Sequence, residues 1–148
     1  MEDTTVQHLV RAMYRLAVVQ RHIARDTLSE LGSQGFVTLG MLRRTGPARV
    51  GSIAQHLGID LSVASRQLAA LEAAGYVTRE RDTDDGRAFR VGLTPEGEQV
   101  LLGCFNRTVE AFATVLEGWT ENEVEALAAG LDRLRDDFIG TETSQEAA

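Results

Sequence analysis

The sequence of 148 residues predicts a mainly α-helical fold with one small β-hairpin. Three observations support this prediction. Apolar residues recur at helical spacing over most of the chain, a short helical pattern in the middle is followed closely by a longer one, and two short alternating runs flank an Asp-Gly turn signal. With 43% hydrophobic residues the chain can bury one ordinary core, so we expect a single domain.

Two helices are expected before the middle of the chain. The first covers residues 5–30 and ends at Gly32 and Gly35. The second is short and ends at the turn signal Gly46-Pro47. The apolar stripe of the first helix steps mostly by three or four residues and consists of Val6, Leu9, Met13, Leu16 and Ile23.

The next segments form a helix-turn-helix followed by a hairpin. Residues 50–58 predict a short helix with a capping box from Ser52 to Gln55, and residues 61–75 predict a longer one after a tight link. Asp85-Gly86 then marks the turn between two β-like runs, Tyr76 to Arg81 and Phe89 to Leu93. We therefore expect residues 34–95 to form a winged helix-turn-helix unit, an architecture that commonly binds DNA.

The C-terminal third predicts two further helices. Thr94 is a good N-cap with Pro95 at the first helical position, and Thr120 with Glu123 forms a capping box that starts the last helix. Apolar residues of the last helix step by three and four, which favours a partner helix. We expect residues 1–33 and 96–140 to be dimerisation helices and 141–148 to be a disordered tail. The proposed dimerisation residues are Leu9, Met13, Leu16, Val124, Leu127, Leu131, Leu134 and Phe138.

The charge is unevenly distributed along the chain. The formal net charge is −7, yet residues 43–90 hold eight arginines against six acids, whereas residues 96–148 hold three against twelve. The chain has no lysine, and its arginines suit phosphates and guanine edges, although a genome-wide codon bias would give the same composition. No apolar run is long enough for a membrane span and the N-terminus is acidic, so we expect a cytoplasmic protein without membrane contact.

The longer helix of the helix-turn-helix has an unusually small outward face. Ala64, Leu68 and Leu71 point to one side. Short side chains allow close approach in the major groove, where Arg66 can read guanine and Val63 can contact a thymine methyl. The alternative is a solvated helix whose alanines only favour helix formation. The proposed DNA-contacting residues of this helix are Ser62, Val63, Ser65, Arg66, Ala69 and Ala70.

The hairpin tip carries Arg87, which could enter a minor groove or lie along a phosphate. We hypothesise that Asp82 or Asp85 orients its guanidinium before binding. The alternative is an ordinary polar turn with an exposed ion pair worth under about 1 kcal/mol. Further candidate phosphate contacts are the helix N-terminus at Ser52 and the arginines Arg43, Arg44, Arg49, Arg79 and Arg81.

No catalytic or cofactor apparatus is predicted. Cys104 is the only cysteine, and we expect a buried small hydrophobe rather than a redox sensor. The histidines His8, His22 and His56 lack metal-ligand spacing, so no metal or cofactor is expected and we expect no enzyme.

The stretch from Ser52 to Gly97 resembles the multiple antibiotic resistance regulator (MarR) family. The matching segments are IAQHLGIDLSVASRQLAALEAAGYVTRERDTDDGR and VGLTPEG, and the order of helices fits across nearly the whole chain. One departure is Gly86, which stands where the family usually has the first of two adjacent arginines. The features that match in order are Leu71-Glu72, Gly75, Arg79, Asp82, Asp85, Arg87 and the segment from Leu93 to Gly97.

The resemblance implies a homodimeric transcriptional regulator, expected to be a repressor, on an inverted-repeat double-stranded operator. It also implies a small lipophilic or phenolic effector bound between the dimer helices and the DNA-binding unit. Redox-sensing members carry their cysteine in the first helix, which has none here. Two rivals remain: a winged-helix module that binds protein and not DNA, which suits the acidic net charge, and a metal sensor of another winged-helix family.

Overall fold

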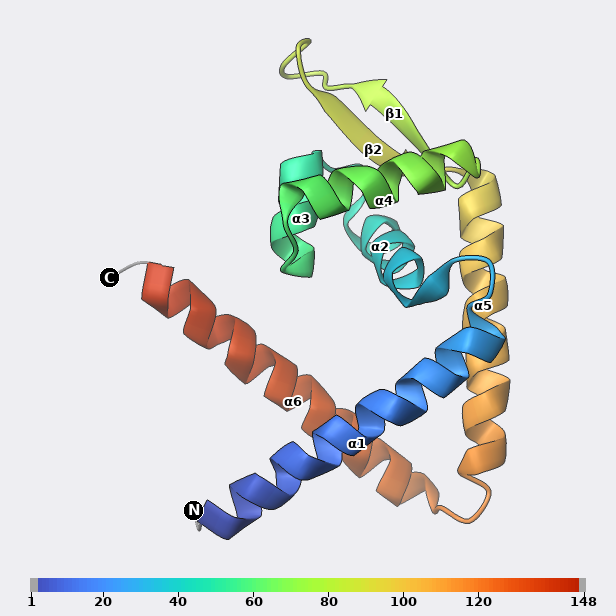
Figure 1. Ribbon diagram of the computed structural model, residues 1–148, viewed down its shortest axis with the longest axis vertical. Helices are drawn as coiled ribbons and strands as arrows, with labels where there is room; N and C mark the ends of the chain where they lie inside the picture. Colours follow the sequence, from blue (N-terminus) through green and yellow to red (C-terminus); the bar gives the residue numbers. More distant parts are fainter. Residues whose placement is uncertain (1–2, 147–148) are drawn as a thin grey trace. The chain divides into compact units, whose positions relative to one another are not determined.

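The computed structural model describes the backbone of residues 3–146 and the side chains of residues 4–138 (Figure 1). The chain divides into two compact units, Met1–Ala111 and Phe112–Ala148, and each is described by itself. The predicted mainly α-helical fold with a two-stranded antiparallel hairpin is confirmed. In chain order, the elements are α1 (Asp3–Thr27), α2 (Gly32–Thr45), α3 (Val50–Leu57), α4 (Leu61–Ala73), β1 (Val77–Arg81), β2 (Phe89–Leu93), α5 (Pro95–Val115) and α6 (Glu121–Glu146).

The core of the first unit lies where α2, α3, α4, the hairpin and the start of α5 meet. The stripe of α4 predicted to face inward, Ala64, Leu68 and Leu71, is buried. Full burial of each of the two leucines stabilises the fold by roughly 1.5–3 kcal/mol, so this cluster fixes α4 against its neighbours. The cluster comprises Leu39, Met41, Leu42, Ile53, Leu68, Leu71, Val77, Val91 and Leu101.

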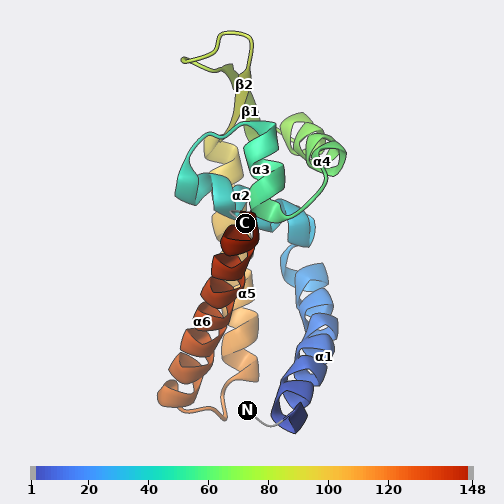
Figure 2. The ribbon, with the colours of Figure 1, turned by 90° about the vertical axis from the view of Figure 1, so that its left-hand side faces the viewer.

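The hairpin is continued by a third short segment. Strands β1 and β2 pair antiparallel from Val77 opposite Leu93 to Arg81 opposite Phe89. On the other side of β2, Ala48 exchanges two backbone hydrogen bonds with Val91, at 2.8 and 3.0 Å. The segment before α3 is therefore held extended beside the hairpin. Figure 2 shows the hairpin projecting beyond α3 and α4.

The helix boundaries differ from the prediction at the first two helices. Gly32 has φ of +63° and marks the break, as expected, but Gly35 lies inside α2. An added Cβ at Gly35 would make only ordinary van der Waals contact, 3.4 Å from Leu31 Cβ and 3.5 Å from Leu71 Cδ2. The predicted stop at Gly35 is therefore wrong, because the positive φ of Gly32 already provides the break and α2 continues through Gly35.

The predicted capping box at Ser52 is also wrong. Arg49 is the N-cap residue of α3 and no side chain caps this helix, so Ser52 lies within the first turn. The reason is the bridge between Ala48 and Val91, which keeps the backbone extended up to Arg49 and lets the helix begin at Val50. This long-range pairing overrides the local capping signal.

The start of α5 agrees with the prediction. Thr94 Oγ1 accepts a hydrogen bond from the Gly97 amide at 3.0 Å and donates one to the Gly75 carbonyl at 2.7 Å. Thr94 therefore starts α5 and also joins it to the turn that follows α4.

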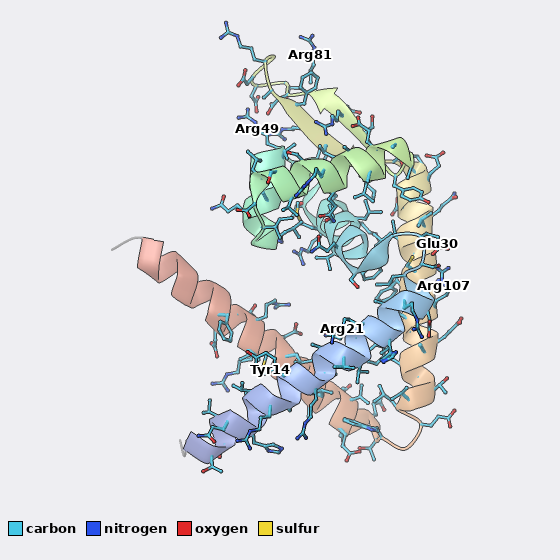
Figure 3. All side chains as sticks on the ribbon, viewed as in Figure 1. Tyr14, Arg21, Glu30, Arg49, Arg81 and Arg107 are labelled. Atoms are coloured by element: carbon cyan, nitrogen blue, oxygen red, sulfur yellow. The ribbon has the colours of Figure 1, made fainter. Side chains whose placement is uncertain are left out.

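A polar cluster joins the end of α1 to α5. Arg107 Nε donates to the Thr27 carbonyl at 3.2 Å, and its Nη2 pairs with the Glu30 carboxylate, as Figure 3 shows. Thr108 Oγ1 donates to Thr27 Oγ1 at 3.0 Å. Cys104 beside them is fully buried as predicted, and burial raises the pKa of its thiol. This cluster fixes the C-terminal end of α1 on α5.

The second unit consists mainly of α6. The predicted capping box is confirmed, because Glu123 Oε2 accepts from the Thr120 amide at 2.8 Å and Thr120 Oγ1 accepts from the Glu123 amide at 3.4 Å. The helix runs to Glu146, beyond position 140 where we expected it to end. No proline follows and Glu and Gln are good helix formers, so the helix propagates. Residues 147 and 148 of the expected tail lie outside the described residues.

None of the helices in the described part of the chain combines the length and the apolar character that a bilayer span requires.

Candidate nucleic-acid interface

The outward face of α4 has the small side chains that the sequence predicted. Val63 and Ser65 at its flanks are half-buried. Arg66 is the only large side chain among these predicted contacts, and within the described residues its guanidinium makes no hydrogen bond or ion pair. The face is therefore slim and carries one unpaired cation. Its exposed residues are Ser62, Arg66, Ala69 and Ala70.

The hairpin tip places Arg87 in solvent. Asp85 Oδ1 accepts a hydrogen bond from the Arg87 backbone amide at 3.1 Å, which shapes the turn. No ion pair in the described residues involves the Arg87 guanidinium. Asp85 thus orders the backbone of Arg87 and does not hold its side chain, in contrast to the hypothesis drawn from the sequence.

Asp82 has other partners than the expected Arg87. Its side chain is fully buried, and Oδ2 accepts from Arg49 Nε at 2.7 Å and from Arg90 Nε at 3.2 Å. Oδ1 accepts from the Asp84 amide at 3.0 Å. The backbone hydrogen bond from Asp84 and the guanidinium of Arg49 hold the pKa of Asp82 far below its usual range. Asp82 is thus ionised and joins the hairpin to the start of α3.

Arg90 was not among the residues predicted for this surface. In the alternating strand β2, Arg90 lies between Phe89 and the buried Val91, so alternation could have placed it on the outer face of the hairpin. Its contact with Asp82 had no sequence signal, because the partner of a charged residue across a turn is set by the tertiary fold.

The other candidate phosphate contacts are partly occupied by neighbours. Arg79 Nε donates to Glu72 at 2.9 Å, and Arg43 pairs with Glu98 at 3.4 Å. Arg44 Nη2 lies 3.0 Å from His56 Nε2, and Arg81 Nη1 donates to the Gly86 carbonyl at 3.3 Å. A phosphate must compete with Glu72 for Arg79, whereas Arg66 and Arg87 have no such competitor.

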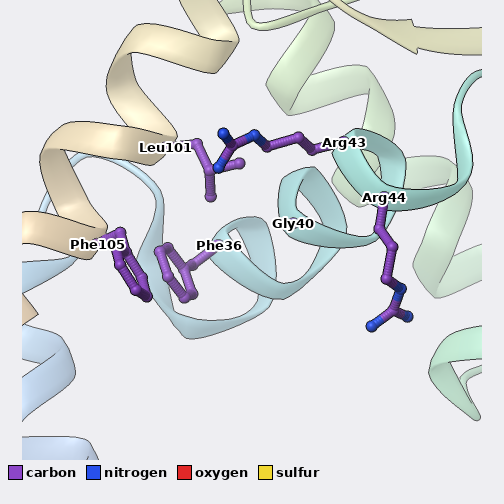
Figure 4. A pocket seen from close by; sticks show the side chains of 6 residues that line it. All are labelled: Phe36, Gly40, Arg43, Arg44, Leu101 and Phe105. Carbon is purple, nitrogen blue, oxygen red and sulfur yellow. The ribbon is translucent and has the colours of Figure 1, made fainter.

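A pocket of about 370 Å³ lies between α2 and α5, below this surface. Figure 4 shows the rings of Phe36 and Phe105 side by side, with Leu101 and the guanidinium of Arg43 next to them. Gly40 forms part of the wall, and Arg44 completes the lining. The lining thus combines two aromatic rings with the guanidinium of Arg43, which also pairs with Glu98.

A family model described as the MarR family matches residues 31–89, which run from the residue before α2 to the first residue of β2. Among curated proteins, a helix-turn-helix-type transcriptional regulator of Bacillus subtilis, YxaD, is 34% identical over 109 residues, which are 74% of this chain and 76% of that protein. The chain belongs to the MarR family. It is therefore a winged-helix transcriptional regulator of a DNA-binding family.

Solved structures agree on the fold of this MarR-family chain. A MarR family protein from Bacillus stearothermophilus has a TM-score of 0.82 and 23% identity, covering 94% of this chain and 99% of that one. Wild-type MarR from E. coli in its apo form has a TM-score of 0.72 and 22% identity, covering 85% and 96%. In this fold α4 is the second helix of the helix-turn-helix and the β1–β2 hairpin is the wing.

Proposed function

We propose that this MarR-family chain is a homodimeric repressor that binds an inverted-repeat operator and leaves it when a small aromatic or lipophilic anion binds. The observation that carries the proposal is the slim, exposed face of α4, with an unpaired Arg66, beside a wing whose tip presents an unpaired Arg87. This arrangement supports sequence reading by the helix and backbone contact by the wing.

The proposed contacts divide by chemistry. Arg66 is placed to fork onto a guanine edge and Val63 to contact a thymine methyl, while the exposed alanines allow the helix to approach the bases. Arg87 enters the minor groove or contacts a phosphate beside it. Arg79 and the first turn of α3 at Ser52 contribute backbone contacts that position the reading helix.

The dimer is supported by apolar faces that a single copy leaves in solvent. On α1, Leu9, Met13 and Leu16 are between 41% and 49% exposed, and on α6 Leu127 and Leu131 are 49% and 47% exposed. Soluble monomers rarely leave such continuous apolar stripes uncovered. A second copy covers them, and its two-fold axis makes the operator an inverted repeat whose half-sites lie about 34 Å apart. The remaining proposed interface residues are Val124, Leu134 and Phe138.

Charge supports the same pairing between copies. The helix α1 contains four arginines and two aspartates, whereas α6 contains two arginines and eight acids. Contact between α1 of one copy and α6 of the other therefore brings opposite charges to the rim of an apolar interface.

The effector proposal rests on the pocket between α2 and α5. Its volume lies in the range of small-molecule sites, and its two rings and the Arg43 guanidinium match a phenolic or carboxylic anion, which must compete with Glu98 for Arg43. Because α2 belongs to the DNA-binding unit, a ligand there can favour one position of that unit over another. The ligand shifts the equilibrium only by the difference of its affinities for the two states.

The deciding experiment selects duplexes bound by the wild-type protein from a random pool and measures their affinity by fluorescence anisotropy at several salt concentrations. We expect an inverted-repeat consensus and binding that weakens steeply with salt. Weak binding that salt does not change, with no consensus, would favour a protein-binding module instead. Loss of binding on addition of the aromatic anion benzoate tests the effector, and a promoter fused to a reporter tests repression.

A further inference from the structure

Arg49, in the extended segment before α3, and Arg90 of β2 share one buried carboxylate, that of Asp82, where β1 passes into the wing loop. The backbone pairing of Ala48 with Val91 brings Arg49 opposite Arg90, and both Nε atoms donate to the same oxygen of Asp82. Since these bonds measure 2.7 and 3.2 Å, the two Nε atoms lie within about 6 Å of each other. Figure 3 shows Arg49 between α3 and the hairpin.

Two like charges placed opposite each other on neighbouring strands repel, so this pair needs compensation. Asp82 supplies it with a side chain that has 0% exposure. The two arginines are 46% and 43% exposed, and each uses only Nε toward the carboxylate. Within the described residues, no other hydrogen bond of either guanidinium is found, so their Nη groups remain available to a ligand.

We propose that Arg49 and Arg90, held together by Asp82, form a binding site for one phosphodiester group of the DNA backbone. The inference rests on the proposed DNA-binding function and adds a site to it. Two guanidiniums and one carboxylate leave a single positive charge, which matches the single negative charge of a phosphodiester. Each of its two non-bridging oxygens accepts from one guanidinium.

The surroundings of the pair set the direction from which DNA can approach. Arg49 is the N-cap of α3, whose first turn has no side-chain cap, so backbone N–H groups point to the same region. Asp84 and Asp85 of the wing loop also act electrostatically on Arg49. These acids repel a phosphate on the loop side and favour its approach from the side of α3.

The test compares Arg49→Ala, Arg90→Ala and the double variant on a duplex selected by the wild-type protein. The slope of log affinity against log salt counts the phosphates neutralised, at about 0.9 for each. We expect each single variant to lower the slope by about 0.9 per protomer, and the double variant to lower it no further, because all three lose the same phosphate. Arg133→Ala, an exposed arginine of α6, is the matched control and should leave the slope unchanged.

A second variant distinguishes a phosphate contact from a purely structural role of the two arginines. Arg90→Lys keeps the charge, but a single ammonium cannot serve Asp82 and a phosphate in the way that Nε and Nη of one guanidinium do. Because the cluster keeps its net charge of +1, we expect Arg90→Lys to bind more weakly but to keep a slope close to wild type, unlike Arg90→Ala, while circular dichroism shows a folded protein. If the alanine variants lose affinity but keep the wild-type slope, the two arginines only hold the wing in place. If the double variant loses twice as much slope as each single variant, the two arginines contact separate phosphates. Either result overturns the proposed site.

The controls also separate the site from the function on which it rests. A wild-type protein that binds no duplex at low salt removes the proposed function and the site together. If wild type shows a steep salt slope and the alanine variants show the same slope, the phosphate site is excluded while the proposed function stands.

Discussion

Gly97, near the start of α5, lies so close to the carbonyl of Tyr76 that an added Cβ would sit 2.1 Å from the oxygen and 2.9 Å from the carbon. The same oxygen accepts a hydrogen bond from the Thr94 amide at 3.1 Å, so it cannot move away freely. Gly97 is therefore required for the close approach of α5 to Tyr76, in the turn that follows α4.

Gly97→Ala should destabilise the protein by at least the ~1–3 kcal/mol typical of overpacking, because the clash is with backbone. Thermal unfolding measures this. Gly103→Ala is the matched control on the same helix, where an added Cβ only makes ordinary contact with Arg107 at 3.5 Å. That change should stabilise by up to ~1 kcal/mol. Equal effects of the two variants would contradict the packing argument.

Arg66→Lys should reduce discrimination between the selected operator and a scrambled duplex by about 1–3 kcal/mol, because lysine cannot fork onto guanine. Its charge is kept, so binding to the scrambled duplex and its salt dependence should stay close to wild type. Anisotropy on both duplexes measures the difference. Unchanged discrimination would place Arg66 on a phosphate or in solvent instead of on a base.

Leu131→Asp should convert the dimer into a monomer and abolish operator binding, since it places a charge within the apolar stripe of α6. Light scattering coupled to size exclusion measures the mass. Ala129→Asp adds the same charge on the opposite side of that helix, by helical spacing, and should leave the dimer intact. A dimeric Leu131→Asp protein would move the interface elsewhere.

Asp82 should make the stability of the protein pH-dependent in acid. Its pKa is lowered in the folded state, so its contribution is fully present above the unfolded pKa of about 4 and is lost as pH falls through the folded value. Denaturant unfolding of wild type and Asp82→Asn should therefore differ by a constant amount between pH 5 and 7 and by progressively less below about pH 4. A difference that grows in acid would contradict this assignment.

Gly40→Leu should fill the pocket between α2 and α5 without straining the helix, because an added Cβ at Gly40 meets no atom within 4 Å. Operator affinity should stay close to wild type, while release by benzoate should be lost. Titration of the preformed complex with benzoate measures both. Equal release from the variant would place the effector site outside this pocket.

Sequence reasoning was most successful where the signal is local. Thr94 and Thr120 act as caps because the partner amides lie three residues away, and the buried stripe of α4 follows directly from helical spacing. It failed at Ser52, where a capping pattern was present but a distant strand pairing set the start of α3. The stop predicted at Gly35 failed because the break lies at Gly32, whose φ is +63°, and α2 continues through Gly35.

The sequence by itself determined the order of the elements, the faces of α4 and the position of the wing, because periodicity, caps and turn residues act within a few positions of each other. Only the tertiary structure decided that Asp82 holds Arg49, 33 positions away, and Arg90 instead of Arg87. A carboxylate is satisfied by whichever donors the packed backbone brings within about 3 Å of it, and those donors can come from anywhere in the chain.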